Sequence, residues 1–169
     1  MAIGLLLIRL AFGVLMAAHG SQKLFSWFGG YGLTGTATFF EQLGFRPGRL
    51  FAAAASLTEV IGGVLVASGF GGPIGPALVV SVMIVAVVSV HWGHGLFAAT
   101  NGIEVPLLYA ASAAALAFTG FGRYSLDALF GLTSMWTTSN AGIALGLAAL
   151  GAIANLAARQ SAVPSSVHA

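Results

Sequence analysis

The sequence predicts an all-α membrane protein, a polytopic bundle of apolar helices that cross the lipid bilayer. Hydrophobic residues make up 58% of the 169 residues, charged residues make up only 6%, and the mean hydropathy is +0.97. A soluble domain carries about 25% charged residues, so this chain has too few polar groups to cover a surface that faces water. Its apolar runs also recur at the length of roughly 20 residues that a membrane-spanning helix needs.

Four core spans are expected from these apolar runs, and breaks rich in glycine and proline separate them. The four expected spans are residues 2–24, 49–70, 74–97 and 105–121. A fifth segment, residues 140–158, is long enough but rich in alanine and glycine, hence weakly hydrophobic. We expect it to be a fifth transmembrane helix, with a helix lying on the membrane surface as the alternative.

The connection between the first two spans, residues 25–48, is too long for a simple turn. Within it, Thr38 and Glu41 have the spacing of a capping box, and Gly44 is a typical stop. The apolar side of this stretch carries Phe39, Phe40 and Leu43. The pattern predicts a short amphipathic helix at the membrane interface.

A second short helix is expected after the fourth span. Ser125 is a suitable N-cap, Asp127 falls in the first turn and Gly131 would end the helix. The predicted organisation is therefore a four-helix bundle over residues 1–131, a fifth transmembrane helix over 132–158 and a disordered tail over 159–169.

The basic residues predict the orientation in the membrane, because loops rich in Lys and Arg stay in the cytoplasm. With five spans, one side of the membrane holds Lys23, Arg46, Arg49 and Arg159, whereas the other holds Arg123. The prediction is a protein of the plasma membrane with the first loop and the C-terminus in the cytoplasm.

In the first span, one helix face carries the ionisable and small residues. At about 100° per residue, Gly13, Met16, Gly20 and Lys23 all fall within about 40° of Arg9. Because ionisable groups are costly at membrane depth, this face is expected to meet protein rather than lipid.

The second span has a similar face. Ala52, Ser56, Glu59 and Gly63 form a stripe of small residues with one carboxylate in it. Counted from the outer ends of the two spans, Glu59 lies about four residues, or roughly 6 Å, from the depth of Arg9. We predict an Arg9–Glu59 ion pair, with Glu59 as a proton acceptor or quinone partner as the alternative.

The remaining ionisable groups are expected at the inner end of the bundle. His91 and His94 share a helix face at the end of the third span, near the level of His19, and Glu104 follows at the start of the fourth. With Lys23 and Glu59 they would form a polar pocket, and Arg9 is a further candidate for it. Hydrogen bonding at the interface, a proton relay and a quinone pocket are all open for this group, whereas haem or metal ligation is the least favoured.

Several function classes are excluded or restricted by the sequence. No basic tract is dense enough for nucleic-acid binding. Cysteine is absent, which excludes thiol chemistry and iron–sulfur clusters on this chain, so a redox role needs a bound cofactor, a quinone or a partner protein. Gly142 and Gly146 have GxxxG spacing, which permits close helix contact within the chain or in a homo-oligomer.

Several motifs, read together, resemble the DoxX family of small bacterial membrane proteins. They are "RLAFGVLMAAHGSQKL" (9–24), "LTEVIGGVLVASG" (57–69), "VHWGHGLF" (90–97), "NGIEVPLLY" (101–109) and "GFGRYSLD" (120–127). The resemblance implies a compact four-helix membrane bundle. It also implies that the family's marked polar and glycine positions are Arg9, His19, Gly20, Lys23, Leu24, Glu59, Gly63, His91, Gly102, Glu104, Arg123 and Asp127.

The same resemblance implies a link to quinone-coupled oxidation of reduced sulfur compounds, or to membrane assemblies that handle oxidative stress. We expect an accessory or anchor subunit of such an assembly, with a quinone-binding polar pocket and a soluble redox partner. The alternatives are a quinone-coupled oxidoreductase subunit in its own right, and a non-enzymatic membrane scaffold or transporter.

Overall fold

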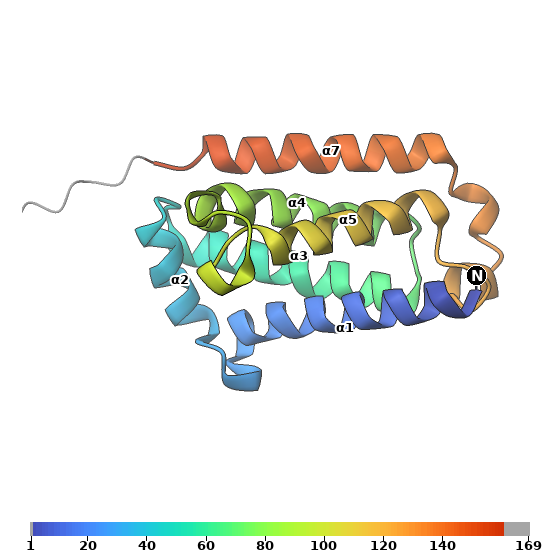
Figure 1. Ribbon diagram of the computed structural model, residues 1–169, viewed down its shortest axis with the longest axis horizontal. Helices are drawn as coiled ribbons and strands as arrows, with labels where there is room; N and C mark the ends of the chain where they lie inside the picture. The colour runs from blue at the N-terminus through green and yellow to red at the C-terminus, as the bar shows by residue number, and fades with distance from the viewer. Residues whose placement is uncertain (1, 161–169) are drawn as a thin grey trace, which may run out of the picture.

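The computed structural model describes residues 2–160, which form helices and connecting turns without any strand. Five long helices lie side by side and alternate in direction (Figure 1). They are α1 (Ala2–Phe25), α3 (Gly48–Ser68), α4 (Ile74–Ala86), α5 (Glu104–Thr119) and α7 (Thr138–Ala157). The chain is therefore the all-α membrane bundle that its composition predicts.

Four helices are long and apolar enough to cross a membrane. They are α1, α3, α7 and the continuous stretch Ile74–His94, in which the π-turn η2 (Val87–His91) and the 3₁₀ turn η3 (Trp92–His94) extend α4. Large apolar side chains on their outer faces are exposed, as lipid contact requires; Ile143, Leu147 and Leu150 of α7 are each more than 60% exposed.

The last two long helices differ from the expectation in which of them is long enough to span a membrane: α7 qualifies and α5 does not. The span expected at 105–121 is α5, which has only 16 residues and so rises about 24 Å, less than the ~30 Å of a hydrocarbon core. It ends at Gly120, whose φ of +70° breaks the helix. The segment with the weakest hydrophobic signal, α7, is a full 20 residues long.

At one end of the bundle, α2 (Gly32–Gln42) crosses the helix ends (Figure 1). The short helix expected between the first two spans is thus present, but the capping box is wrong. The helix begins at Gly32, and Thr38 lies inside it, where its hydroxyl donates to the Thr34 carbonyl at 3.3 Å. Glu41 instead accepts a hydrogen bond from the Gly48 amide at 3.3 Å and so joins α2 to α3.

The same end holds the connection between α4 and α5, which includes η4 (Ala98–Thr100), and the C-terminal end of α7 (Figure 1). Of the tail expected at 159–169, residues 161–169 lie outside the described residues. The Arg159 side chain donates to the Leu43 carbonyl, and the Gln160 amide donates to the Gly44 carbonyl at 2.8 Å. These two bonds attach the end of α7 to the α2–α3 connection.

The opposite end holds the N-terminus, α6 (Leu126–Leu129) and η5 (Thr133–Met135) (Figure 1). Ser125 caps α6 as predicted, because its hydroxyl accepts a hydrogen bond from the Ala128 amide at 3.2 Å. The segment from the end of α1 through η1 (Trp27–Gly29), by contrast, lies at the α2 end of the bundle and exposes Phe25, Trp27 and Phe28.

Close contact between α1 and α3 depends on glycines. A methyl group on Gly20 would lie 2.6 Å from the Ser56 carbonyl oxygen, and one on Gly63 would lie 2.4 Å from the Ala17 amide nitrogen. On the facing stripe of α3, Ala52 and Ser56 are fully buried. Both predicted faces are therefore confirmed as inward-facing, and the two backbones touch because no side chain separates them.

We predict that Gly63→Ala weakens the bundle, because its methyl group would meet backbone atoms of α1 that cannot turn aside. Overpacking of this kind costs about 1–3 kcal/mol, so the melting temperature in mild detergent should fall by several degrees. Gly146→Ala is the matched control, since the space around this exposed helical glycine is open. Equal melting temperatures for the two variants would contradict the close contact.

Candidate functional site

A cavity of about 610 Å³ opens between α2, α3 and the second half of α4, near the C-terminal end of α1. Its walls are mostly apolar. They include Phe39 and Phe40 from α2 and Val82, Val85 and Ala86 from α4. The polar side chains on the lining belong mainly to α1, α2, α3 and η2, and they include Lys23, Thr36, Glu59, Ser89 and His91.

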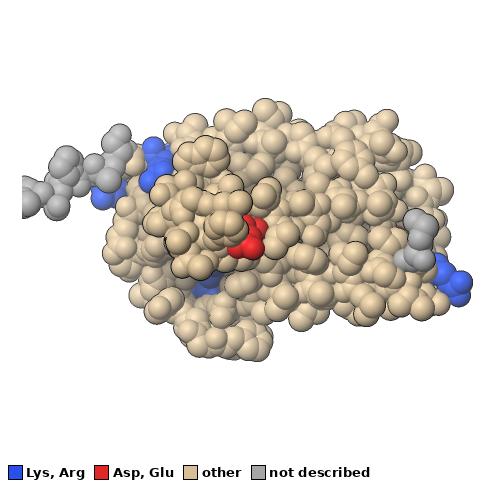
Figure 2. Space-filling model, in the orientation of Figure 1, with Lys and Arg blue, Asp and Glu red and all other residues tan. Residues whose placement is uncertain are grey.

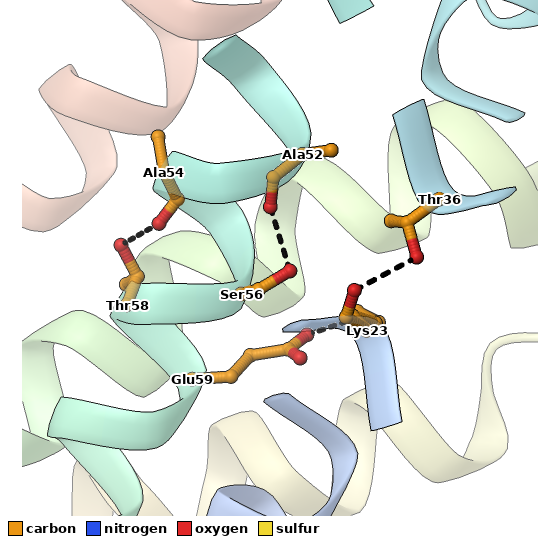
Figure 3. A network of polar contacts seen from close by, with 7 residues as sticks. All are labelled: Lys23, Thr36, Ala52, Ala54, Ser56, Thr58 and Glu59. Carbon is orange, nitrogen blue, oxygen red and sulfur yellow. Dashed lines mark hydrogen bonds and ion pairs between the residues drawn. The ribbon is translucent and has the colours of Figure 1, made fainter. Parts of the chain in front are cut away.

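The centre of this polar group is an ion pair between two helices (Figure 3). The Lys23 ammonium lies 2.5 Å from Oε1 of Glu59, whose side chain is only 3% exposed. The Lys23 carbonyl also accepts a hydrogen bond from the Thr36 hydroxyl at 3.3 Å, which joins α1 to α2. One lysine thus connects α1 to α2 and to α3, which are two of the helices that wall the cavity.

The predicted Arg9–Glu59 ion pair is wrong. The contacts of Gly13 with Ala67 and of Gly20 with Ser56 set the register of the antiparallel helices α1 and α3. In this register Arg9 lies level with Gly69, about ten residues or roughly 15 Å along the axis from Glu59. The error has a simple cause: the first turns of α1 extend beyond the end of α3, so the two spans do not start at one depth.

Arg9 belongs instead to a separate polar layer at the other end of the bundle. Its guanidinium donates to the carbonyls of Ala67, at 3.3 Å, and Tyr124. In the same layer, the carboxylate of Asp127 is buried and accepts hydrogen bonds from the amides of Gly71, at 2.9 Å, and Gly72, at 2.8 Å. The Asp127 bonds hold the α3–α4 turn against α6, and Arg9 joins α1 to α3 and to the segment between α5 and α6, which is a structural role.

The sequence-predicted site residues therefore divide into groups. Lys23, Glu59 and His91 meet at the cavity. His19 is exposed and places its ring edge-on to Tyr109, with 6.1 Å between the ring centroids. The gathering of all seven candidate residues in one pocket, which the sequence suggested, does not occur, because only Lys23, Glu59 and His91 of them line the cavity.

The two other residues expected in the pocket lie in the turns around it. His94 is exposed, and its carbonyl accepts a hydrogen bond from the Thr100 hydroxyl at 2.8 Å. The Glu104 carboxylate accepts one from the Ala98 amide, also at 2.8 Å, and so orders η4. Arg123, which the family pattern marks, is exposed with its guanidinium over the Tyr124 ring at 4.8 Å.

Ser89 is a cavity residue that the sequence reasoning missed. It lies in the π-turn η2, which brings Ser89, Val90 and His91 to the same cavity. Single π-turns within α-helices are often found at functional sites, but hydrophobic periodicity gives no sign of one. The only signal in the sequence is a hydroxyl two residues before the histidine, within an otherwise apolar run.

Two buried polar atoms of the cavity lining have no hydrogen-bond partner within the described residues. Among the described residues, neither Oε2 of Glu59 nor the hydroxyl oxygen of Ser89 has a hydrogen-bond partner, although both atoms are buried. Buried polar atoms are nearly always paired, and each exception needs an explanation. Together with the apolar walls, these atoms make the cavity suited to a mostly apolar ligand with polar groups at one place.

The described part of the chain contains no group of side chains that could bind a metal ion. Within residues 2–160, no cluster of three or more histidine, aspartate or glutamate side chains is close enough to hold an ion.

All residues that line this cavity lie within a region that matches a known protein family. The family model described as DoxX matches residues 4–92, which is more than half of the chain. Lys23, Glu59, Ser89 and His91 all fall inside the matched region. The search of curated proteins and the search of solved structures found no match.

We predict that Lys23→Met destabilises the bundle, because it leaves the buried Glu59 carboxylate without its partner. Removing one member of a buried pair costs about 3–5 kcal/mol; as Lys23 is partly exposed, we expect a loss of about 2–3 kcal/mol. The double variant Lys23→Met/Glu59→Gln should regain much of that loss in thermal unfolding. Strictly additive effects of the two substitutions would show that the pair is not coupled.

Proposed function

We propose that this chain, which belongs to the DoxX family, is the membrane subunit of a redox assembly and that its cavity binds a lipid-soluble quinone. The observation that carries the proposal is the cavity itself, with apolar walls and with the Lys23–Glu59 pair among its few polar groups. Small-molecule sites commonly have volumes of about 300–1,000 Å³ and this kind of lining.

The lining fits a quinone ring in particular. An ammonium group has three N–H donors, and Glu59 accepts from only one of those on Lys23. The remaining donors can bind a carbonyl oxygen of the ring, while Val82, Val85 and Phe39 contact the ring and its apolar tail. A bound quinone would supply two-electron, two-proton redox chemistry.

The position of the cavity also favours a ligand that arrives from the lipid. Its lining includes side chains at α2 that are themselves open to the surroundings: Phe39 of α2 is 43% exposed, and Tyr31, the residue just before α2, is 87% exposed. Because α2 crosses the ends of the long helices (Figure 1), this opening lies at the level where the bundle meets the membrane interface. A lipid-soluble molecule would enter there without crossing water.

An accessory role follows from the side chains available. Without cysteine, the chain offers no thiol to exchange electrons with a donor, so electrons for a bound quinone would come from a partner protein. The end of the bundle with α2 carries three exposed arginines, Arg46, Arg49 and Arg159, and Figure 2 shows part of this basic group beside the end of the described chain. We place a soluble redox partner at this end.

The same charges predict that the α2 end faces the cytoplasm at the plasma membrane. Because the chain has no cysteine, single cysteines can report the orientation. In intact cells, Ser134→Cys, at the opposite end, should react with a membrane-impermeant maleimide, whereas Gln160→Cys should react only after permeabilisation. Both positions are exposed. The reverse labelling pattern would place the α2 end outside the cytoplasm.

Quinone binding is tested with the purified full-length chain in lipid nanodiscs and a short-chain benzoquinone. Ala86 lines the cavity, so Ala86→Phe should fill part of it and weaken binding at least tenfold in equilibrium dialysis. The matched control is Val88→Phe, two residues further along the same helical segment, at an exposed position outside the cavity lining.

Unchanged quinone affinity in the Ala86→Phe variant, or no binding by the wild-type chain, would refute the quinone site. Both variants should have melting temperatures close to that of the wild type, so that a loss of binding reports the cavity and not a loss of fold.

A further inference from the structure

We infer that the cavity binds the hydroquinone form of its ligand more tightly than the quinone form. This inference rests on the proposed quinone site and specifies which redox form the site recognises. The two forms share the ring and the tail and differ by two electrons and two protons. The quinone has two carbonyl oxygens, which only accept hydrogen bonds, whereas the hydroquinone has two hydroxyl groups, which also donate.

The first argument is the free oxygen of Glu59. Oε1 accepts from Lys23, while Oε2 is buried and has no donor among residues 2–160 (Figure 3). An ionised carboxylate only accepts hydrogen bonds. A ligand hydroxyl would satisfy Oε2, whereas a ligand carbonyl placed there would set two acceptors against each other.

The second argument is the tautomer of His91. Its Nδ1 lies 2.7 Å from the carbonyl oxygen of Asn101. Because a carbonyl oxygen cannot donate, Nδ1 must carry the proton, and in the neutral ring Nε2 is then an acceptor. His91 lines the cavity, so a second side chain of the lining has an acceptor for a ligand hydroxyl.

The other polar groups do not reverse this preference. Lys23 donates to an oxygen of either form, because a hydroxyl oxygen accepts as well as a carbonyl oxygen does. The Ser89 hydroxyl can donate or accept and so also fits both forms. Four further residues of the lining carry hydroxyl or amide groups that can donate or accept and so also fit both forms: Tyr31, Thr36, Thr38 and Gln42. Two acceptor groups thus favour the hydroquinone, and the other polar side chains of the lining are neutral between the forms.

The expected preference is on the order of tenfold to a hundredfold, since an unsatisfied buried acceptor weakens binding by about that factor. Tighter binding of the reduced form raises the midpoint potential of the bound couple. For a two-electron couple, each tenfold preference corresponds to about 30 mV. The site would therefore make the bound quinone a better electron acceptor for the partner protein than the same quinone free in the lipid.

The test compares the two forms directly on the full-length chain in nanodiscs under anaerobic conditions. Dissociation constants are measured for a decyl benzoquinone and for the matching hydroquinone. We expect the hydroquinone to bind at least tenfold more tightly. The dimethyl ether of the hydroquinone, which has no donor, should lose this advantage without any change of redox state.

A substitution at Glu59 tests whether its carboxylate causes the preference for the hydroquinone. Glu59→Gln replaces the free carboxylate oxygen by an amide that can also donate, so the ratio of the two dissociation constants should fall towards one. Thr58→Val is the matched control: Thr58 is the neighbouring residue on α3, lies outside this cavity lining, and bonds to the Ala54 carbonyl (Figure 3). It should keep the ratio of the wild type.

The outcomes separate this inference from the function on which it rests. Equal affinities, or tighter binding of the quinone, would overturn the preference and leave the quinone site standing. Binding of neither form would overturn both. If Glu59→Gln binds with an unchanged ratio, the carboxylate is not the source of the preference. If that variant does not fold, the ratio in the wild-type chain and the loss on methylation still decide the question.

Discussion

The close contact between α1 and α3 determines where the charged groups of this bundle lie. Glycines let the two backbones touch in the observed register, and that register sets Lys23 against Glu59. The same register places Arg9 at the C-terminal end of α3, where it bonds to Ala67 and to Tyr124. The ion pair in turn supports the site, since the Lys23 carbonyl holds α2 through Thr36 and α2 forms a wall of the cavity.

The buried carboxylates of Asp127 and Glu59 differ in how many of their oxygens are paired within the protein. In the layer at Asp127, both carboxylate oxygens accept backbone hydrogen bonds that join two turns. In the layer at Glu59, one oxygen is paired and the other, although buried, is not paired within the described residues. Each oxygen of Asp127 thus has a partner within the protein, whereas Oε2 of Glu59 at the cavity can take its first hydrogen bond from a ligand.

Much of the fold could be predicted from the sequence, because its signals are local. The inward faces of α1 and α3 follow from helical periodicity and from the cost of charge in lipid, and the cap of α6 follows from Ser125. Local reasoning failed for the start of α2. The spacing of Thr38 and Glu41 suggested that the helix begins at Thr38, but Thr38 lies in the second half of α2. The π-turn at Ser89 leaves no mark in the hydrophobic pattern.

The sequence by itself determined the class of the protein, its inward helix faces and the residues able to serve a polar pocket. Each of these depends on composition or on the fixed geometry of one helix. Only the tertiary structure decided which of those residues meet, because the partner of a buried charge depends on how far one helix slides along another. That sliding is set by backbone contact at Gly13, Gly20 and Gly63, and it replaced an expected Arg9–Glu59 pair by Lys23–Glu59 at the edge of a cavity.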